Sequence, residues 1–249
     1  SDFDWNYLLD FTDSKNKISY AGSFGPRKPS IEKERLLRQL SRFKNLSVRE
    51  SGAAEFIEQN SSLKCQVVPD PTLLLSAGTW GNLAGEKPLL SSPYIFVYAP
   101  HFRRGLIDFA LKLSEKTGLP LVLTNRVSLK EQLRLRLKGK VIYRMDAGPA
   151  EFLNLIRNAS YVVSGSFHAI VFSLIFGVPF FALGGHKDNR MKEILTKARC
   201  IDRIVDGEHP EMYDKIINEA GSMPQFDKII EPDVTAAIEY LKSALDIDS

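Results

Sequence analysis

Residues 161–183 read YVVSGSFHAIVFSLIFGVPFFAL, and their pattern of apolar residues indicates the fold class. The short β-branched run Tyr161–Ser164 is typical of a buried strand, and Pro179–Leu183 is a second one. Between them Ser166 is suited to cap an apolar helix, which Gly177 interrupts. A strand, a helix and a strand in this order form one unit of a parallel α/β sheet.

The same alternation extends in both directions from this unit. Further strands are expected at Ile18–Gly22, Leu46–Val48, Gln66–Val68, Tyr94–Ala99, Leu119–Thr124 and Val141–Arg144. Further helices are expected at Ser30–Phe43, Ser51–Gln59, Arg104–Thr117, Ser128–Leu137, Pro149–Arg157, Asn189–Lys197 and Asp233–Leu245. The pattern predicts an α/β protein with two Rossmann-like lobes.

The stretch Ser76–Pro93 is rich in glycine, serine and proline, and it is predicted to be the linker between the two lobes. We therefore expect residues 1–90 to form an N-terminal lobe with few strands, and residues 91–249 to form a fuller C-terminal lobe. The last helix is free to pack back on the first lobe.

Composition narrows the functional classes. The chain has 249 residues, of which 44% are hydrophobic and 25% charged, with a formal net charge of +3. This charge is too small for a nucleic-acid-binding protein driven by bulk electrostatics. No apolar run reaches about eighteen residues, and the first residues do not resemble a signal peptide, so a cytoplasmic location is expected.

No metal site is expected. Cys65 and Cys200 are far apart, and His101, His186 and His209 have no companions at metal-ligand spacing.

The loop after Tyr161–Ser164 is a candidate site. Ligands of open α/β sheets bind outside the carboxyl ends of the strands, where helix N-termini offer free amides to anions. Ser166, Phe167 and His168 lie at such a position, and His168 is a candidate proton-transfer group. The alternative is a histidine near the cap that only packs.

A second candidate loop joins the strand ending at Leu183 to a helix starting at Asn189. Lys187 and Arg190 stand at this helix start, where the helix dipole disfavours cations. A bound anion that compensates them is one interpretation, and a solvated polar loop is the other.

The first lobe contributes several candidates. Arg49 ends a strand, and its guanidinium suits a carboxylate or a phosphate, although a surface ion pair with Glu50 or a neighbour is about equally consistent. Asp70 either caps a turn or faces a cleft. Ser23 lies in a strand-ending run of small residues, and Trp80 either packs or stacks on a sugar.

Six blocks in this order resemble the motif series of the polysaccharide pyruvyl transferase family. The blocks are Tyr20–Gly25, Ser47–Glu50, Asp70–Leu74, Ser164–Ala169, Phe176–Phe180 and Asn189–Arg190, with Asp202-Arg203 after them. The resemblance implies a fold similar to that of the GT-B glycosyltransferases, and it places His168 and Arg49 on the family's functional histidine and arginine. Relatives usually have aspartate at the position of Gly165, and they have a further N-terminal segment, so we expect an incomplete N-terminal lobe.

The resemblance also implies chemistry. Phosphoenolpyruvate would be the donor and co-substrate, with no other cofactor, and a sugar or lipid-linked oligosaccharide would be the acceptor, in exopolysaccharide or cell-surface glycan synthesis. It is compatible with peripheral association with membrane-bound glycan assembly. The donor side would comprise Ser23, Ser166, Phe167, Lys187 and Arg190 beside the catalytic pair.

The sequence leaves the roles of several residues and the class of function open. His168 could act as acid or base. Glu50, Asp70 and Trp80 are assigned to the acceptor side or to structure. The alternatives to a pyruvyl transferase are a GT-B nucleotide-sugar glycosyltransferase and a non-catalytic module that binds sugars or anions.

Overall fold

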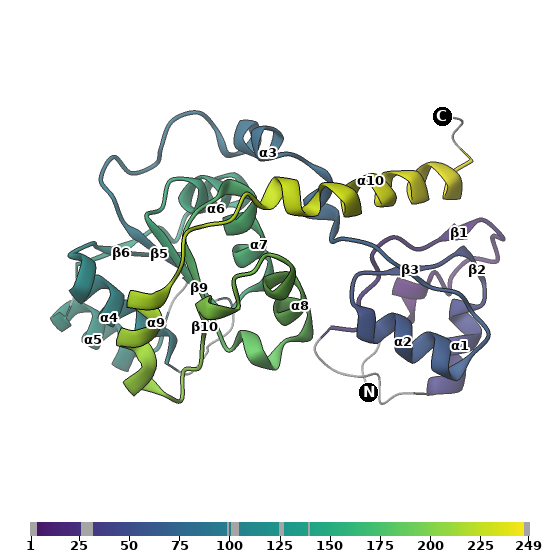
Figure 1. The fold of residues 1–249 in the computed structure, drawn as a ribbon, viewed down its shortest axis with the longest axis horizontal. Coiled ribbons are helices and arrows are strands. Elements are labelled where there is room, and N and C mark those ends of the chain that lie inside the picture. The colour runs from purple at the N-terminus through teal and green to yellow at the C-terminus, as the bar shows by residue number, and fades with distance from the viewer. Residues whose placement is uncertain are drawn as a thin grey trace. The chain divides into compact units, whose positions relative to one another are not determined.

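The computed structural model describes residues 4–25, 32–98, 100, 105–124, 127–138 and 140–246 (Figure 1). The chain forms two compact units. Unit 1 comprises Ser1–Leu74 and Ile230–Ser249, and unit 2 comprises Leu75–Ile229. The units divide after Leu74, earlier than the boundary predicted at residue 90. The reason is that helix α3, Ala77–Ala84, lies in the predicted linker and packs against α6, Pro149–Arg157, in unit 2.

Unit 2 contains a six-stranded parallel sheet with the strand order β10-β9-β8-β5-β6-β7. The strands are β5 Ile95–Tyr98, β6 Leu121–Leu123, β7 Val141–Tyr143, β8 Tyr161–Ser164, β9 Phe180–Leu183 and β10 Ile204–Val205. This is the strand order of the Rossmann fold, in which the direction of winding reverses between two central strands. The reversal falls between β5 and β8, which pair over their whole length.

Helices cover both faces of this sheet (Figure 1). One face packs against α4, α5 and α9 through a core that includes Phe109, Leu135, Phe181 and Tyr213. The other face packs against α6, α7 and α8, where rings from the sheet and the helices meet edge to face. The bounds are α4 Leu106–Thr117, α5 Leu129–Lys138, α7 Phe167–Phe176, α8 Asn189–Lys197 and α9 Tyr213–Glu219.

Gly105, which precedes α4, makes a close backbone approach that only glycine allows. Its φ is +75°, and a Cβ there would lie 2.4 Å from the carbonyl oxygen of Gly207 and 2.6 Å from the Tyr213 hydroxyl. The start of α4 is therefore fixed against the segment that follows β10.

Unit 1 is built from short parallel strand pairs. β1 Lys17–Ile18 pairs with β2 Phe43–Asn45, and β3 Ser47–Val48 pairs with β4 Gln66–Val67. Helices α1, Lys33–Leu40, and α2, Ser51–Asn60, pack over a core that includes Leu36, Leu40 and Ile57. The predicted helix start at Ser30 lies outside the described residues.

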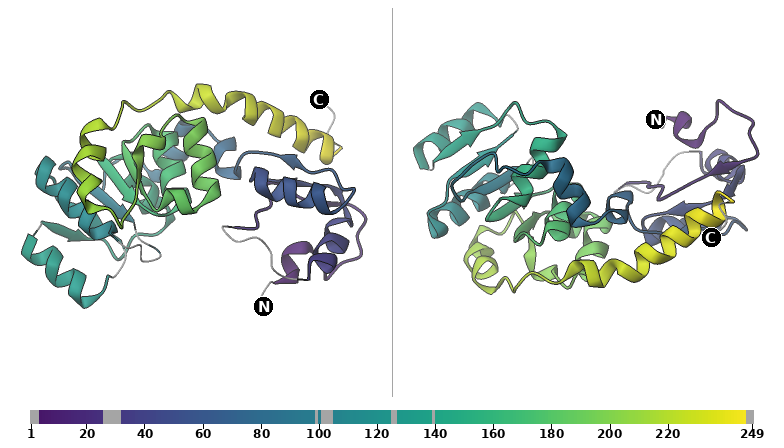
Figure 2. Two further views of the ribbon diagram at one scale, coloured as in Figure 1. Left: turned by 60° about the horizontal axis from the view of Figure 1, so that its bottom comes forward. Right: turned by 90° about the horizontal axis from the view of Figure 1, so that it is seen from above.

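The last helix, α10, spans Phe226–Ala244 and is continuous in Figure 2. In unit 1 its Ala237 packs with Ala21 and Val68, and the Tyr240 hydroxyl donates to the carbonyl oxygen of Ser19 at 2.7 Å. These contacts join the end of the chain to the strands near its start.

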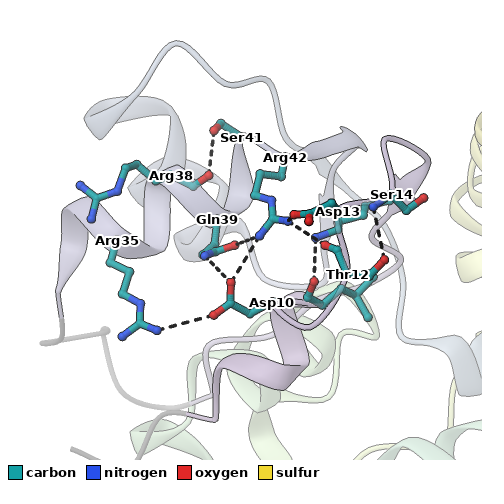
Figure 3. Close-up of polar contacts among 11 residues, drawn as sticks. Asp10, Thr12, Asp13, Ser14, Arg35, Arg38, Gln39, Ser41 and Arg42 are labelled. Carbon is teal, nitrogen blue, oxygen red and sulfur yellow. Dashed lines mark hydrogen bonds and ion pairs between the residues drawn. The ribbon is translucent and has the colours of Figure 1, made fainter.

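Polar contacts hold the N-terminal segment on α1 (Figure 3). The carboxylate of Asp10 accepts a hydrogen bond from Gln39 at 2.6 Å and pairs with Arg42 at 3.3 Å. Arg42 also pairs with Asp13 at 2.9 Å. Within the described ranges, no helix is both long enough and apolar enough to cross a membrane.

Candidate functional site

The structure places the loop after β8 where the sheet reverses its winding. Ser164, the last residue of β8, is fully buried. Its hydroxyl donates to the carbonyl oxygen of Tyr98 at 2.7 Å, at the end of β5, and accepts from the amide of Ser166 at 3.0 Å. The start of α7 is thereby fixed at the carboxyl ends of β5 and β8, the position at which α/β sheets of this order bind ligands.

The predicted residues of this loop form the start of α7. Ser166 occupies the N-cap position, although its side chain makes no capping hydrogen bond there, contrary to the expected role. Phe167 is largely buried, whereas His168 in the first turn is exposed. The two rings pack edge to face with centroids 5.4 Å apart. This packing restrains the imidazole beside the amides of a helix start, where the dipole favours an anion.

Arg190 joins the same group through Phe167, because its guanidinium carbon lies 5.5 Å from the centre of that ring. The guanidinium also binds both carboxylate oxygens of Asp188, with Nε–Oδ1 and Nη2–Oδ2 distances of 3.0 and 2.7 Å. Asp188 caps α8 by accepting from the amides of Arg190 and Met191. Burial opposes ionisation of this carboxyl group, but the hydrogen bonds and charge of Arg190 outweigh it, and the pKa of Asp188 is lowered.

In the structure the two candidate cations Lys187 and Arg190 each have a carboxylate partner, and their binding of an anion stays a prediction. Asp188 compensates the charge of Arg190. Lys187 lies in the short turn Gly185–Lys187, and its ammonium pairs with Glu208 at 3.4 Å on the surface. The sequence Asp-Asn-Arg at the predicted helix start is a pattern from which the N-cap role of Asp188 could have been predicted.

Unit 1 brings Arg49 and Asp70 together. Arg49 follows β3 and Asp70 follows the neighbouring parallel strand β4, so both lie at the same edge of the pair. Their side chains form an ion pair, and only 2% of the Asp70 side chain is exposed. The other carboxylate oxygen accepts from the amide and hydroxyl of Thr72 at 3.1 and 2.8 Å. Burial, and secondarily the charge of Asp70, raises the pKa of Tyr20 to about 12.

Glu50 and Ser23 form a second contact beside this pair. The Ser23 hydroxyl donates to the carboxylate of Glu50, which is buried at the start of α2, where a negative charge is favoured. The sequence also allowed an ion pair of Arg49, and in the structure Arg49 pairs with Asp70.

Trp80 lies in unit 2. Its ring packs edge to face on Phe172 of α7, with centroids 5.1 Å apart. This contact agrees with the packing interpretation of Trp80.

The described residues contain no group of three or more histidine, cysteine, aspartate or glutamate side chains arranged to hold a metal ion. A hollow of about 560 Å³ lies beside α4 and is lined by residues that include Asp108, Glu208 and Tyr213. None of the predicted site residues lines it.

The architecture defines an α/β fold with a six-stranded parallel sheet, and solved structures that share this fold include two UDP-GlcNAc 2-epimerases. The UDP-GlcNAc 2-epimerase from Methanocaldococcus jannaschii superposes with a TM-score of 0.56 at 15% identity, covering 88% of this chain and 68% of that structure. The UDP-GlcNAc 2-epimerase from Neisseria meningitidis bound to UDP-GlcNAc gives a TM-score of 0.50 at 13% identity, covering 86% and 65%. At these identities the likeness shows the fold alone, and the chain spans about two thirds of each structure's length.

The family follows from the sequence itself. The sequence model of the polysaccharide pyruvyl transferase family matches residues 1–187 of the 249, and this chain belongs to that family. This match confirms the family resemblance and spans the first five of the six motif blocks, whereas Asn189–Arg190 lies after it. No curated protein matches the chain in sequence.

Proposed function

We propose that this protein transfers the pyruvyl group of phosphoenolpyruvate to two hydroxyl groups of a sugar, in the synthesis of an exopolysaccharide or another cell-surface glycan. One observation carries the proposal within the family. The exposed His168 lies in the first turn of α7, where the sheet reverses its winding. Its ring packs on the ring of Phe167, and the guanidinium of Arg190 lies over that same Phe167 ring.

The reaction needs one proton delivered to carbon and one phosphate released. Protonation of the methylene carbon of phosphoenolpyruvate converts it to a methyl group and leaves C2 electron-deficient. The first sugar hydroxyl adds to C2 and loses its proton. The second hydroxyl then displaces phosphate from C2 and loses its proton, which closes the cyclic ketal. His168 is assigned either the acid that protonates the methylene carbon or the base that accepts a hydroxyl proton.

The donor carries a carboxylate and a phosphate group, and the surroundings of His168 suit such a ligand. The first amides of α7 point outward from a helix start that Ser164 fixes in place. Asp188 holds the plane of the Arg190 guanidinium through two hydrogen bonds, which pre-organises it for bidentate binding. Lys187, whose exposed side chain pairs with Glu208, adds positive charge at longer range.

Arg49 of unit 1 is assigned to the same reaction by the family resemblance. Its ion pair with the buried Asp70 restrains the guanidinium in the same way as Asp188 restrains Arg190. Phosphoenolpyruvate is the co-substrate, and the scheme as written uses no other cofactor.

The decisive experiment measures phosphate release from phosphoenolpyruvate with a panel of sugar and lipid-linked acceptors. His168→Ala should lower turnover by about 10²–10⁴-fold with an unchanged unfolding midpoint. His209→Ala is the matched control, because His209 is an exposed histidine of the same unit that hydrogen-bonds to Glu211. Near-normal turnover of His168→Ala would remove that residue from the mechanism.

Ligand binding separates this proposal from its alternatives. Isothermal titration should show binding of phosphoenolpyruvate to the wild-type protein and weaker binding to Arg49→Ala. The Neisseria meningitidis structure contains UDP-GlcNAc, so this nucleotide sugar is the appropriate competitor. Stabilisation by UDP-GlcNAc and not by phosphoenolpyruvate would favour a nucleotide-sugar enzyme. Binding without phosphate release on any acceptor would favour a non-catalytic module.

A further inference from the structure

Helix α5 presents a row of leucines to solvent. Leu129, Leu133 and Leu137 are spaced four residues apart, which places them along one face of the helix. They are 83%, 60% and 76% exposed. Leu135, on another face, is fully buried in the core of unit 2 and holds the helix in place. Isolated exposed leucines are ordinary, but a row of three on one helix forms a contiguous apolar patch, which is typical of an interaction surface.

Positive side chains border this row. At 100° per residue, Lys130 and Arg136 fall on either side of the three leucines, and Lys140 follows the helix. All three are exposed, and none of them pairs with a carboxylate among the described residues. The only carboxylate of α5, Glu131, forms an ion pair with Arg134 at 3.0 Å. The surface is therefore aliphatic along its centre and cationic at its borders.

We infer that this leucine row of α5 binds the surface of an anionic lipid bilayer. The leucines would enter the boundary between headgroups and acyl chains, and the bordering cations would contact negatively charged headgroups. An aliphatic centre with basic borders on an amphipathic helix is the chemistry that such a surface selects.

A second copy of the chain fits this surface less well. The ten residues of α5 span about 15 Å, and one row of leucines on them offers far less than the roughly 800 Å² that each partner contributes to a stable protein interface. Two copies meeting through this row would also bring their cations together. A protein partner is disfavoured because hot spots are enriched in tryptophan, tyrosine and arginine, whereas leucine is under-represented.

Vesicle binding of the full chain tests the inference, independently of activity. The protein should sediment with vesicles of equal parts phosphatidylcholine and phosphatidylglycerol but weakly with phosphatidylcholine alone, and salt should reduce the binding. A triple variant with Leu129→Gln, Leu133→Gln and Leu137→Gln should lower the affinity by about tenfold or more, because three apolar side chains are removed. Lys130→Gln with Arg136→Gln should lower it by about 25-fold, at about fivefold for each charge.

Leu83→Gln with Leu245→Gln is the matched control, since these leucines are 57% and 52% exposed and lie outside α5. This control should bind vesicles like the wild type. Failure of the wild type to bind anionic vesicles would overturn the inference, as would equal binding by the triple variant. Concentration-dependent dimerisation that the triple variant abolishes would overturn it in favour of a second copy.

Discussion

Replacing Gly105 with alanine probes the packing that fixes α4 at the carboxyl end of β5. The added Cβ would lie 2.4 Å from the carbonyl oxygen and 2.5 Å from the Cα of Gly207, and 2.6 Å from the hydroxyl of Tyr213. Two of these three atoms belong to the backbone, so rotation of a side chain cannot relieve the contact.

The cost has two parts. A left-handed φ of +75° costs a residue with a Cβ about 1–2 kcal/mol. Forcing apart a packed region adds about 1–3 kcal/mol. Gly105→Ala should therefore destabilise unit 2 by about 2–5 kcal/mol.

Gly118 provides the matched control at the other end of α4. Its φ is +71°, but a Cβ there would meet nothing within 4 Å. Gly118→Ala should therefore cost only the backbone part, about 1–2 kcal/mol. The difference between the two variants isolates the contacts with Gly207 and Tyr213.

Tryptophan fluorescence during urea denaturation can follow unit 2 alone. The chain has two tryptophans, and Trp80 lies in α3 against Phe172. In a Trp5→Phe background Trp80 is the sole reporter, and a shift in midpoint at constant slope gives the free-energy difference. Equal losses in Gly105→Ala and Gly118→Ala would show that the contacts at Gly105 do not limit the stability of unit 2. Adding Tyr213→Phe should recover only a minor part of the loss, since the backbone of Gly207 still blocks the Cβ.

Two further predictions concern the carboxylates that hold the candidate arginines. The pKa of Asp188 is lowered in the folded protein, so its stabilisation is present above the unfolded-state pKa of about 3.9 and is lost as the pH falls through the folded value. Asp188→Asn should therefore be less stable than wild type at neutral pH and should lose part of the acid dependence, as measured by urea midpoints between about pH 3 and 7. Asp70→Asn leaves the guanidinium of Arg49 without its buried counter-charge and should cost about 3 kcal/mol in urea denaturation. The ion pairs of Asp10 are partly exposed, so Asp10→Asn should cost less than about 1 kcal/mol for each pair lost. Equal losses of unfolding free energy in Asp70→Asn and Asp10→Asn would show that burial does not strengthen the Arg49–Asp70 pair.

Elements with strong local signals were predictable from the sequence. The observed bounds of α6, α8 and β8 are those expected, because a proline in the first turn, a change of periodicity or a β-branched run marks their ends. Strand β10, Ile204–Val205, was not predicted from the sequence. Helices α3 and α9, with eight and seven residues, were also not predicted.

Helix α10 shows tertiary packing overriding a local signal. It was expected to begin at Asp233, after Pro232, but it begins at Phe226 and includes the proline. Phe226 and Ile230 are buried, so their packing stabilises the turns before the proline and offsets the hydrogen bond that proline cannot make.

By itself, the sequence determined the alternation of strands and helices, the family and the loops that hold the candidate residues, because periodicity, caps and motif blocks are encoded within a few neighbouring residues. Only the tertiary structure decided the strand order and the partners of buried polar groups. Arg49 pairs with Asp70, 21 residues away, and the Ser164 hydroxyl reaches the carbonyl oxygen of Tyr98 across 66 residues. Such pairs depend on which strands become neighbours in a sheet, and that choice is made by burial of the whole core, not by any local stretch of sequence.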